Sequence, residues 1–131
     1  MLPSCFILAL VRVLYADDNA IFRQKLLTKA VRQVAPLLAE IIRQGIQEDV
    51  LTTPYPEQIG EVIVSLVLSL SDTIAWQLLS PEQERDALLR AEYTVAAYTN
   101  ALERILGAPA GSLPLLETET LKEWFASPND L

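Results

Sequence analysis

Hydrophobic residues recur along this chain at intervals of three and four, the spacing that places side chains on one face of an α-helix. The longest such stripe contains Leu27, Val31, Val34, Leu38 and Ile41, and a second stripe beside it contains Phe22, Leu26, Ala30 and Leu37. Together they predict a helix that runs to about Asp49. Because Pro36 cannot donate a hydrogen bond to the carbonyl one turn back, we expect this helix to be kinked or broken there.

Four other segments carry helical signals. They are Pro3 to Tyr15, Pro56 to Leu79, Pro81 to Leu106 and a short stretch at 116–126, which is followed by a tail at 127–131. Asp17, Asp18 or Asn19 is expected to cap the long helix. With only 4 Gly residues, the chain has few turns for a β architecture. We therefore predict one all-α domain over residues 1–131, a bundle of about five or six helices.

The third and fourth predicted helices have more apolar surface than one copy is expected to hide. The helix from Pro56 is apolar around most of its circumference, whereas a surface helix of a monomer has a polar face. The next helix has a strict three-four alternation of apolar residues. The predicted homodimer interface consists of Leu66, Leu70, Leu88, Ala91, Val95, Tyr98, Leu102 and Ile105.

Composition removes several classes of function. The chain has no His and a single Cys, which excludes Ser/His/Asp and Cys/His catalysis, the usual zinc sites and an internal disulfide. We expect no enzymatic activity, no metal and no cofactor. The net charge of −7 suits nucleic acid poorly, so this chain alone is expected to bind none. Cys5 is interpreted as a small buried hydrophobe in a reducing, cytoplasmic setting.

Two apolar segments have some features of export or membrane signals. The N-terminal run has no basic residue before it, and Arg12 follows where a signal peptide would have a small-residue cleavage site. The run from Ile59 to Leu79 approaches the length of a bilayer span, but Glu61 and Asp72 interrupt it. We expect a doubly buried helix there and no membrane association.

The stretch from LYADDNAIFRQKL through APLLAEIIRQGIQEDVLTTPYPEQIGEVIVSLVLSLSD resembles the C-terminal effector domain of TetR-family transcriptional regulators. The resemblance implies a ligand pocket closed by the first helices. It also implies that the helices from Pro56 and Pro81 pair with their copies in a four-helix dimer interface. Asp49 stands where relatives often have Gly, so the turn there is expected to differ in shape.

Family members begin with a three-helix DNA-binding unit, and nothing similar to its helix-turn-helix precedes FILALVRVLY. The expectation is a chain without a DNA-reading element. It would be a piece of a longer regulator, the product of a misplaced gene start, or a stand-alone descendant.

A small-molecule pocket is mostly apolar with a few polar groups. The candidate ligand-binding residues are Arg12, Tyr15, Phe22, Asp72, Trp76 and Tyr93. A carboxylate in an apolar stretch, as at Asp72, must be paired, hydrogen-bonded, protonated or exposed. Arg12, the only charge in the first helix, is its expected partner. Core packing is the competing interpretation for each aromatic residue, and a structural or solvent-exposed role is the competing one for Asp72.

The sequence therefore predicts the ligand-binding and dimerisation domain of a TetR-like regulator, with a small apolar or amphipathic ligand. The alternative is a ligand-free helical homodimer that serves as a structural or protein-interaction module. A cavity lined by Asp72 or Arg12 would favour the first. An enzyme is the weakest hypothesis, because no nucleophile has a base at a recognisable spacing.

Overall fold

The computed structural model describes residues 4–80 and 84–125, and these residues are arranged as a helical bundle without a strand. In chain order they form α1 (Ser4–Leu14), the 3₁₀ turn η1 (Asp17–Asn19), α2 (Ala20–Gln47), α3 (Pro56–Leu79), α4 (Glu84–Leu106) and α5 (Thr118–Trp124). The predicted all-α class is confirmed. Pro81, expected to begin α4, and the tail at 127–131 lie outside the described residues.

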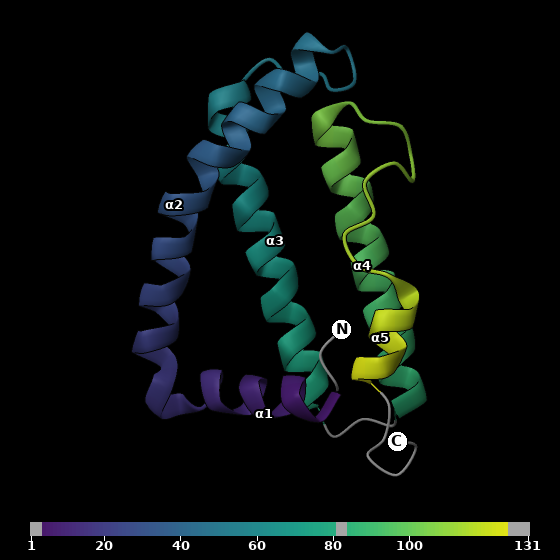
Figure 1. The fold of residues 1–131 in the computed structure, drawn as a ribbon. Helices are drawn as coiled ribbons and strands as arrows, with labels where there is room; N and C mark the ends of the chain where they lie inside the picture. The colour runs from purple at the N-terminus through teal and green to yellow at the C-terminus, as the bar shows by residue number, and fades with distance from the viewer. Residues whose placement is uncertain (1–3, 81–83, 126–131) are drawn as a thin grey trace.

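The helices form an open frame rather than a set of parallel rods. In Figure 1, α1 lies across one end of the molecule, and α2 rises from it to meet α3 at the other end. Helix α4 runs beside α3, and α5 packs on α4 near the α1 end. Helix α1 thereby bridges the gap that α2 and α3 leave where they diverge.

Helix α2 continues through Pro36 as one helix, so the break considered from the sequence does not occur. Figure 1 shows its axis changing direction partway along. Close to this point α2 touches α3: a Cβ atom on Gly60 would lie 2.6 Å from the Ala35 carbonyl oxygen and 3.2 Å from the Ala39 amide nitrogen. The two backbones can approach so closely because Gly60 has no side chain.

The interior contains two hydrophobic clusters. The first contains Leu70, Ile74, Ala87, Ala91, Val95, Leu121 and Phe125, from α3, α4 and the end of α5. The second contains Ile42, Ile63, Leu102 and Leu106, from α2, α3 and α4. Helices α3 and α4 contribute to both clusters, which makes them the central pair of the bundle.

The apolar stripe of α4 faces the interior of its own chain. Ala91 has no exposed surface, and Leu70, Val95 and Leu102 are also buried. The sequence placed these four side chains in a contact between subunits. That assignment stays a prediction, and within the single chain these side chains are covered by α2, α3 and α5.

The other four residues of the predicted interface are half-buried. Leu88 and Tyr98 pack against the first cluster, and Ile105 also lies partly inside. Leu66 lines an open hollow on the outer side of α3 together with Val62. Among the predicted interface residues, Leu66 therefore lies on the outer surface of α3.

A buried carboxylate holds the loop that follows α4. Glu103 is 5% exposed and accepts a hydrogen bond from the Leu113 amide at 3.0 Å. The pKa of Glu103 is lowered by backbone donors, first Leu113 and then Gly111, with Ser112 adding a smaller effect. The loop returns the chain toward α5, so Glu103 fixes the approach of the terminal helix.

The turn after α2 contains a residue in the left-handed conformation. Asp49 has φ 60°, and the amides of Val50 and Leu51 donate to the Gly45 carbonyl at 3.0 and 3.2 Å. Glycine adopts this conformation without strain, whereas aspartate adopts it at some cost. The turn thus keeps a glycine-like geometry despite its aspartate.

Among the described helices, α3 is long and apolar enough, by length and composition, to cross a membrane. It carries Glu61 and Asp72 and packs against α1, α2 and α4. These contacts are those of a central helix in a bundle.

Candidate functional site

A tight corner joins α1 to α2. The Asn19 side-chain amide donates to the Val13 carbonyl oxygen at 2.6 Å, and the Arg23 guanidinium donates to the Leu14 carbonyl oxygen at 2.9 Å. Both carbonyls belong to the last turn of α1, where a helix lacks internal donors. Asn19, one of three expected caps of α2, makes no capping bond to α2 and instead secures the end of α1.

Three helices meet in a polar and aromatic cluster at this corner. The Tyr15 ring contacts the Trp76 ring edge-on, with the ring centres 5.2 Å apart. The Arg23 guanidinium carbon lies 4.5 Å from the centre of the Tyr15 ring, in cation–π geometry. The Tyr15 hydroxyl faces the Asp72 carboxylate, which acts on it through hydrogen bonding and charge. We call Tyr15, Arg23, Asp72 and Trp76 the corner cluster.

The corner cluster alters the acidity of its tyrosine. Burial raises the pKa of Tyr15 to about 12, helped by the hydrogen bond to Asp72 and the charge of that carboxylate, while Arg23 acts in the opposite direction. The hydroxyl is therefore held as a neutral donor to Asp72. Trp76 is 48% exposed, so one side of the cluster is open to solvent.

The structure brings together three of the six predicted ligand residues: Tyr15, Asp72 and Trp76. The partner of Asp72 is Tyr15 rather than Arg12, which lies exposed on α1. Phe22 is exposed on α2.

Tyr93 is exposed on α4, outside the corner cluster. The interpretation of Cys5 as a buried residue is also wrong, since its side chain is exposed.

Sequence reasoning missed Arg23. Its signal was an arginine a few residues beyond a helix end, because such side chains can bind the last carbonyls of a helix. Only the corner at η1 brings Arg23 back over α1, and that geometry is not visible in the spacing of residues.

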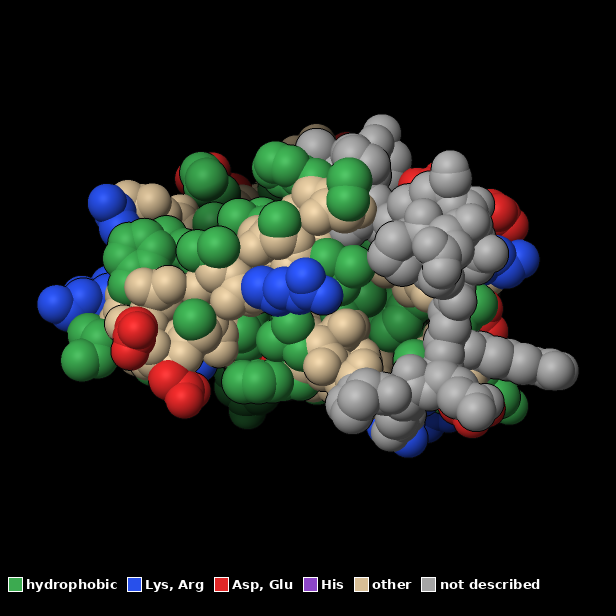
Figure 2. All heavy atoms as spheres, turned by 90° about the horizontal axis from the view of Figure 1, so that it is seen from below, with side chains coloured by type: hydrophobic (Ala, Val, Ile, Leu, Met, Phe, Trp, Pro, Cys, Tyr) green, Lys and Arg blue, Asp and Glu red, His purple; other side chains and the backbone are tan. Residues whose placement is uncertain are grey.

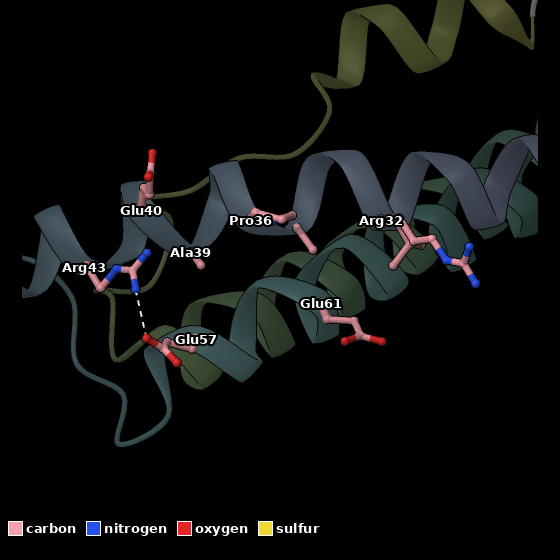
Figure 3. Close-up of a pocket in the computed structure, with 9 residues that line it drawn as sticks. Arg32, Pro36, Ala39, Glu40, Arg43, Glu57 and Glu61 are labelled. Carbon is pink, nitrogen blue, oxygen red and sulfur yellow. Dashed lines mark hydrogen bonds and ion pairs between the residues drawn. The ribbon is translucent and has the colours of Figure 1, made fainter.

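A groove of about 440 Å³ lies between α2 and α3, over their closest contact. Figure 3 shows its charged side chains, with Arg43 bound to Glu57 at 3.1 Å and with Arg32 and Glu61 toward the other end. Three further hollows are described, and none of these four spaces is lined by Asp72 or Arg12. The corner cluster is thus an open, partly exposed site rather than part of one of these hollows.

The outer side of the α3–α4 pair is uneven and partly apolar. Val62 of α3 and Leu89 and Tyr93 of α4 are exposed, and the two helices are linked by a 2.7 Å hydrogen bond between the Ser69 and Tyr98 hydroxyls. One hollow opens on α3 beside Val62, and another opens on α4 beside Tyr93. This side of the pair is available for contact with another molecule.

Within the described residues, no group of three or more His, Cys, Asp and Glu side chains is placed to hold a metal ion.

Comparison with known proteins gave one finding. A family model described as the Tetracyclin repressor-like, C-terminal domain matches residues 9–80, which is more than half of the chain. The matched part contains the corner cluster and all of α2 and α3. No curated protein and no solved structure matches the chain.

Proposed function

Because this chain belongs to the family of TetR-like C-terminal domains, we propose that it is the ligand-binding and dimerisation domain of a TetR-like transcriptional regulator. The observation that carries the proposal is the family match over the second half of α1 and all of α2 and α3. Domains of this family belong to transcription regulators, and no enzymatic step is proposed.

The corner cluster is the proposed contact site for a small apolar or amphipathic ligand. Two aromatic side chains offer apolar surface, and the Asp72 carboxylate has lone pairs beyond the one that Tyr15 occupies. A ligand that pairs a flat apolar group with a hydrogen-bond donor or a positive charge suits this arrangement. Its binding would bias the angle between α1, α2 and α3, provided that it binds one arrangement more tightly than another.

Trp76 provides the readout for this proposal. We expect that, in a panel of small apolar molecules carrying one amine or hydroxyl group, binders will raise the melting temperature and change the fluorescence of Trp76. Trp76→Phe should abolish the fluorescence response, and Asp72→Asn should weaken binding by about tenfold, which corresponds to the loss of one charge-assisted hydrogen bond. Asp86→Asn, an exposed change on α4, is the matched control. Binding that is indifferent to Asp72 and Trp76 would contradict the site.

The proposed homodimer uses the outer side of the α3–α4 pair. Support comes from the exposed apolar side chains Val62, Leu89 and Tyr93, and from Leu66, which lines the hollow beside Val62. Small residues such as Ser65 and Ala97, both exposed, allow a second helix pair to approach closely. The stripe that the sequence assigned to the interface packs inside the chain, so the proposed contact lies on the opposite side of α4.

We expect the chain by itself to bind no operator DNA, because a protein with net charge −7 lacks the basic surface that displaces phosphate counterions. A shift of duplex DNA in electrophoresis at physiological salt would contradict this expectation. A cytoplasmic location, as for TetR-like regulators in general, is part of the same proposal.

A second candidate function is a ligand-free interaction module. It is favoured by one observation, namely that none of the four described hollows is lined by Asp72 or Arg12. Under this alternative the corner cluster only braces α1 against α2 and α3. Asp72→Asn would then lower stability, and no small molecule in the panel would raise the melting temperature.

A further inference from the structure

The outer face of α2 carries an apolar strip that its own chain leaves open. Helix α2 packs on α3 through its inner side, where Ala39 and Ile42 are buried. On the opposite side, large apolar side chains are between 45% and 62% exposed. We call them the α2 strip: Phe22, Leu26, Val34, Leu37 and Ile41.

The members of the α2 strip share one side of the helix. Phe22 and Leu26 are four residues apart, Leu26 and Leu37 are eleven apart, which is three turns, and Ile41 follows after four more. From Phe22 to Ile41 the strip is about 28 Å long at 1.5 Å per residue. Between Leu26 and Val34 the strip is interrupted by the exposed Gln33. An exposed apolar strip of this length is nevertheless uncommon and marks an interaction site.

Cations border the strip along one edge. Lys25 and Lys29 each lie three residues after a member of the strip, and Arg32 follows three residues after Lys29, so the three form a continuous ridge. All three are exposed, and no ion pair among the described residues involves them. Farther along the same edge Glu40 interrupts the positive charge, and Arg43 is bound to Glu57.

The charge of this ridge contrasts with the rest of the chain. The whole chain has a net charge of −7, yet residues 20–39 contain four basic residues and no acidic one. Figure 2, which views the α1 end of the molecule, shows apolar, basic and acidic side chains together on that face.

We propose that the outer face of α2 is a docking surface for an amphipathic helix of another protein, about five turns long, that carries carboxylates along one edge. Its apolar side covers the α2 strip, and its acidic edge lies opposite Lys25, Lys29 and Arg32. The apolar strip supplies most of the affinity, and the ridge fixes the orientation and the sign of charge that is accepted. This surface is separate from the corner cluster and from the outer side of the α3–α4 pair.

The test uses two synthetic helical peptides of 20 residues with the same Leu stripe, one with Glu and one with Lys along the same edge, each labelled with fluorescein. Anisotropy titrations against the full chain should show saturable binding of the Glu peptide and binding at least about tenfold weaker of the Lys peptide. Equal binding of the two peptides, or no saturable binding of the Glu peptide, overturns the proposal.

Variants assign the binding to α2. The double change Lys25→Glu with Lys29→Glu should reverse the preference between the peptides, while Arg104→Glu with Lys122→Glu, the same charge change at exposed positions on α4 and α5, should not. Leu37→Glu should remove binding of both peptides, and Tyr55→Glu, at an exposed loop residue, should leave it intact. Circular dichroism of each variant verifies that it is folded.

Two other occupants of the strip give distinct results. If a second copy covers it, the wild-type chain self-associates and Leu37→Glu dissociates it. If a membrane covers it, the chain sediments with anionic vesicles and Leu37→Glu releases it. Either result overturns the proposal. A failure here leaves the ligand test on Trp76 and Asp72 unaffected, because those residues belong to a different surface.

Discussion

Helices α2 and α4 both carry large hydrophobic side chains at intervals of three and four, but the chain covers them differently. The stripe of α4, which includes Ala91, Val95 and Leu102, is buried by α2, α3 and α5. On α2 the inner stripe is covered by α3, while the outer one remains exposed at Leu37 and its neighbours. Spacing therefore identifies an apolar face of a helix but not the element that covers it.

The difference has a physical origin in the arrangement of the helices. Helix α4 lies between α3 and α5, so its apolar side meets both. Helix α2 stands at the outside of the frame, packs mainly on α3 and meets α4 where Ile42 joins the second cluster (Figure 1). A helix with two apolar stripes and neighbours on one side must leave one stripe open or bind something else.

The largest expected effect on stability is at a buried leucine of the α4 stripe, compared here with an exposed leucine of the α2 strip. Leu102→Ala should lower the free energy of unfolding by about 3 kcal/mol, because it removes buried methyl groups and leaves a cavity. Leu37→Ala should change it by less than about 0.5 kcal/mol, because that side chain is already in water. Urea unfolding of both variants measures the difference. Similar losses in the two would mean that the α2 strip is covered in the free protein.

A second prediction concerns the inner side of α2. Gly60→Ala should destabilise the fold by about 1–3 kcal/mol, since the added methyl group would meet the Ala35 carbonyl and push α2 away from α3. Ser65→Ala, an exposed change on the same helix, serves as the control in the same urea titration. If Gly60→Ala is as stable as Ser65→Ala, the two helices are not in backbone contact.

The corner cluster yields a prediction about pH. The pKa of Tyr15 is raised to about 12 from 10, so the unfolded chain loses this proton at a lower pH than the folded chain does. The stabilisation is therefore complete below pH 10 and is lost as the pH rises toward 12.

Tyr15→Phe should cost about 1 kcal/mol at pH 8, because Asp72 loses its hydrogen-bond donor, and the difference from wild type should shrink above pH 10. Melting temperatures at pH 8 to 12 for wild type, Tyr15→Phe and the exposed-site control Tyr55→Phe test this. A difference that grows with pH would reverse the sign of the argument.

The smallest predicted effect is a gain at the end of α2. Asp49→Gly should stabilise the fold by up to about 1 kcal/mol, since glycine adopts a φ of 60° without steric strain. Glu48→Gly should give no gain, because Glu48 has φ −88°. A loss of stability in Asp49→Gly would show that the Asp49 side chain itself supports the turn.

The sequence predictions were correct for features that depend only on residues close together in the chain. The bounds of α3 were predicted correctly, because Pro56 suits the first turn and the apolar run is continuous to Leu79. The ion pair of Glu119 with Lys122, at 3.4 Å, is equally local, because residues three apart are neighbours on a helix.

Features that depend on the corner or on the frame were not predictable from spacing. Arg23 reaches Tyr15 only because η1 turns the chain back on α1. The burial of Val95 and Leu102 could be predicted only by knowing that α3 lies on their side of α4. The spacing of apolar residues predicts where the helices lie along the chain. The directions of the connecting turns determine which helix faces pack together.

The central claim, that this is the dimerising domain of a regulator and that it pairs through the outer side of α3 and α4, is tested most directly by its mass in solution. Light scattering at rising concentrations should give twice the chain mass of 14.5 kDa for wild type and for the exposed-loop control Tyr55→Glu, and a single chain for Tyr93→Glu. A wild-type protein that stays a single chain at every concentration, or a dimer that survives Tyr93→Glu but dissociates on Leu37→Glu, would contradict the account.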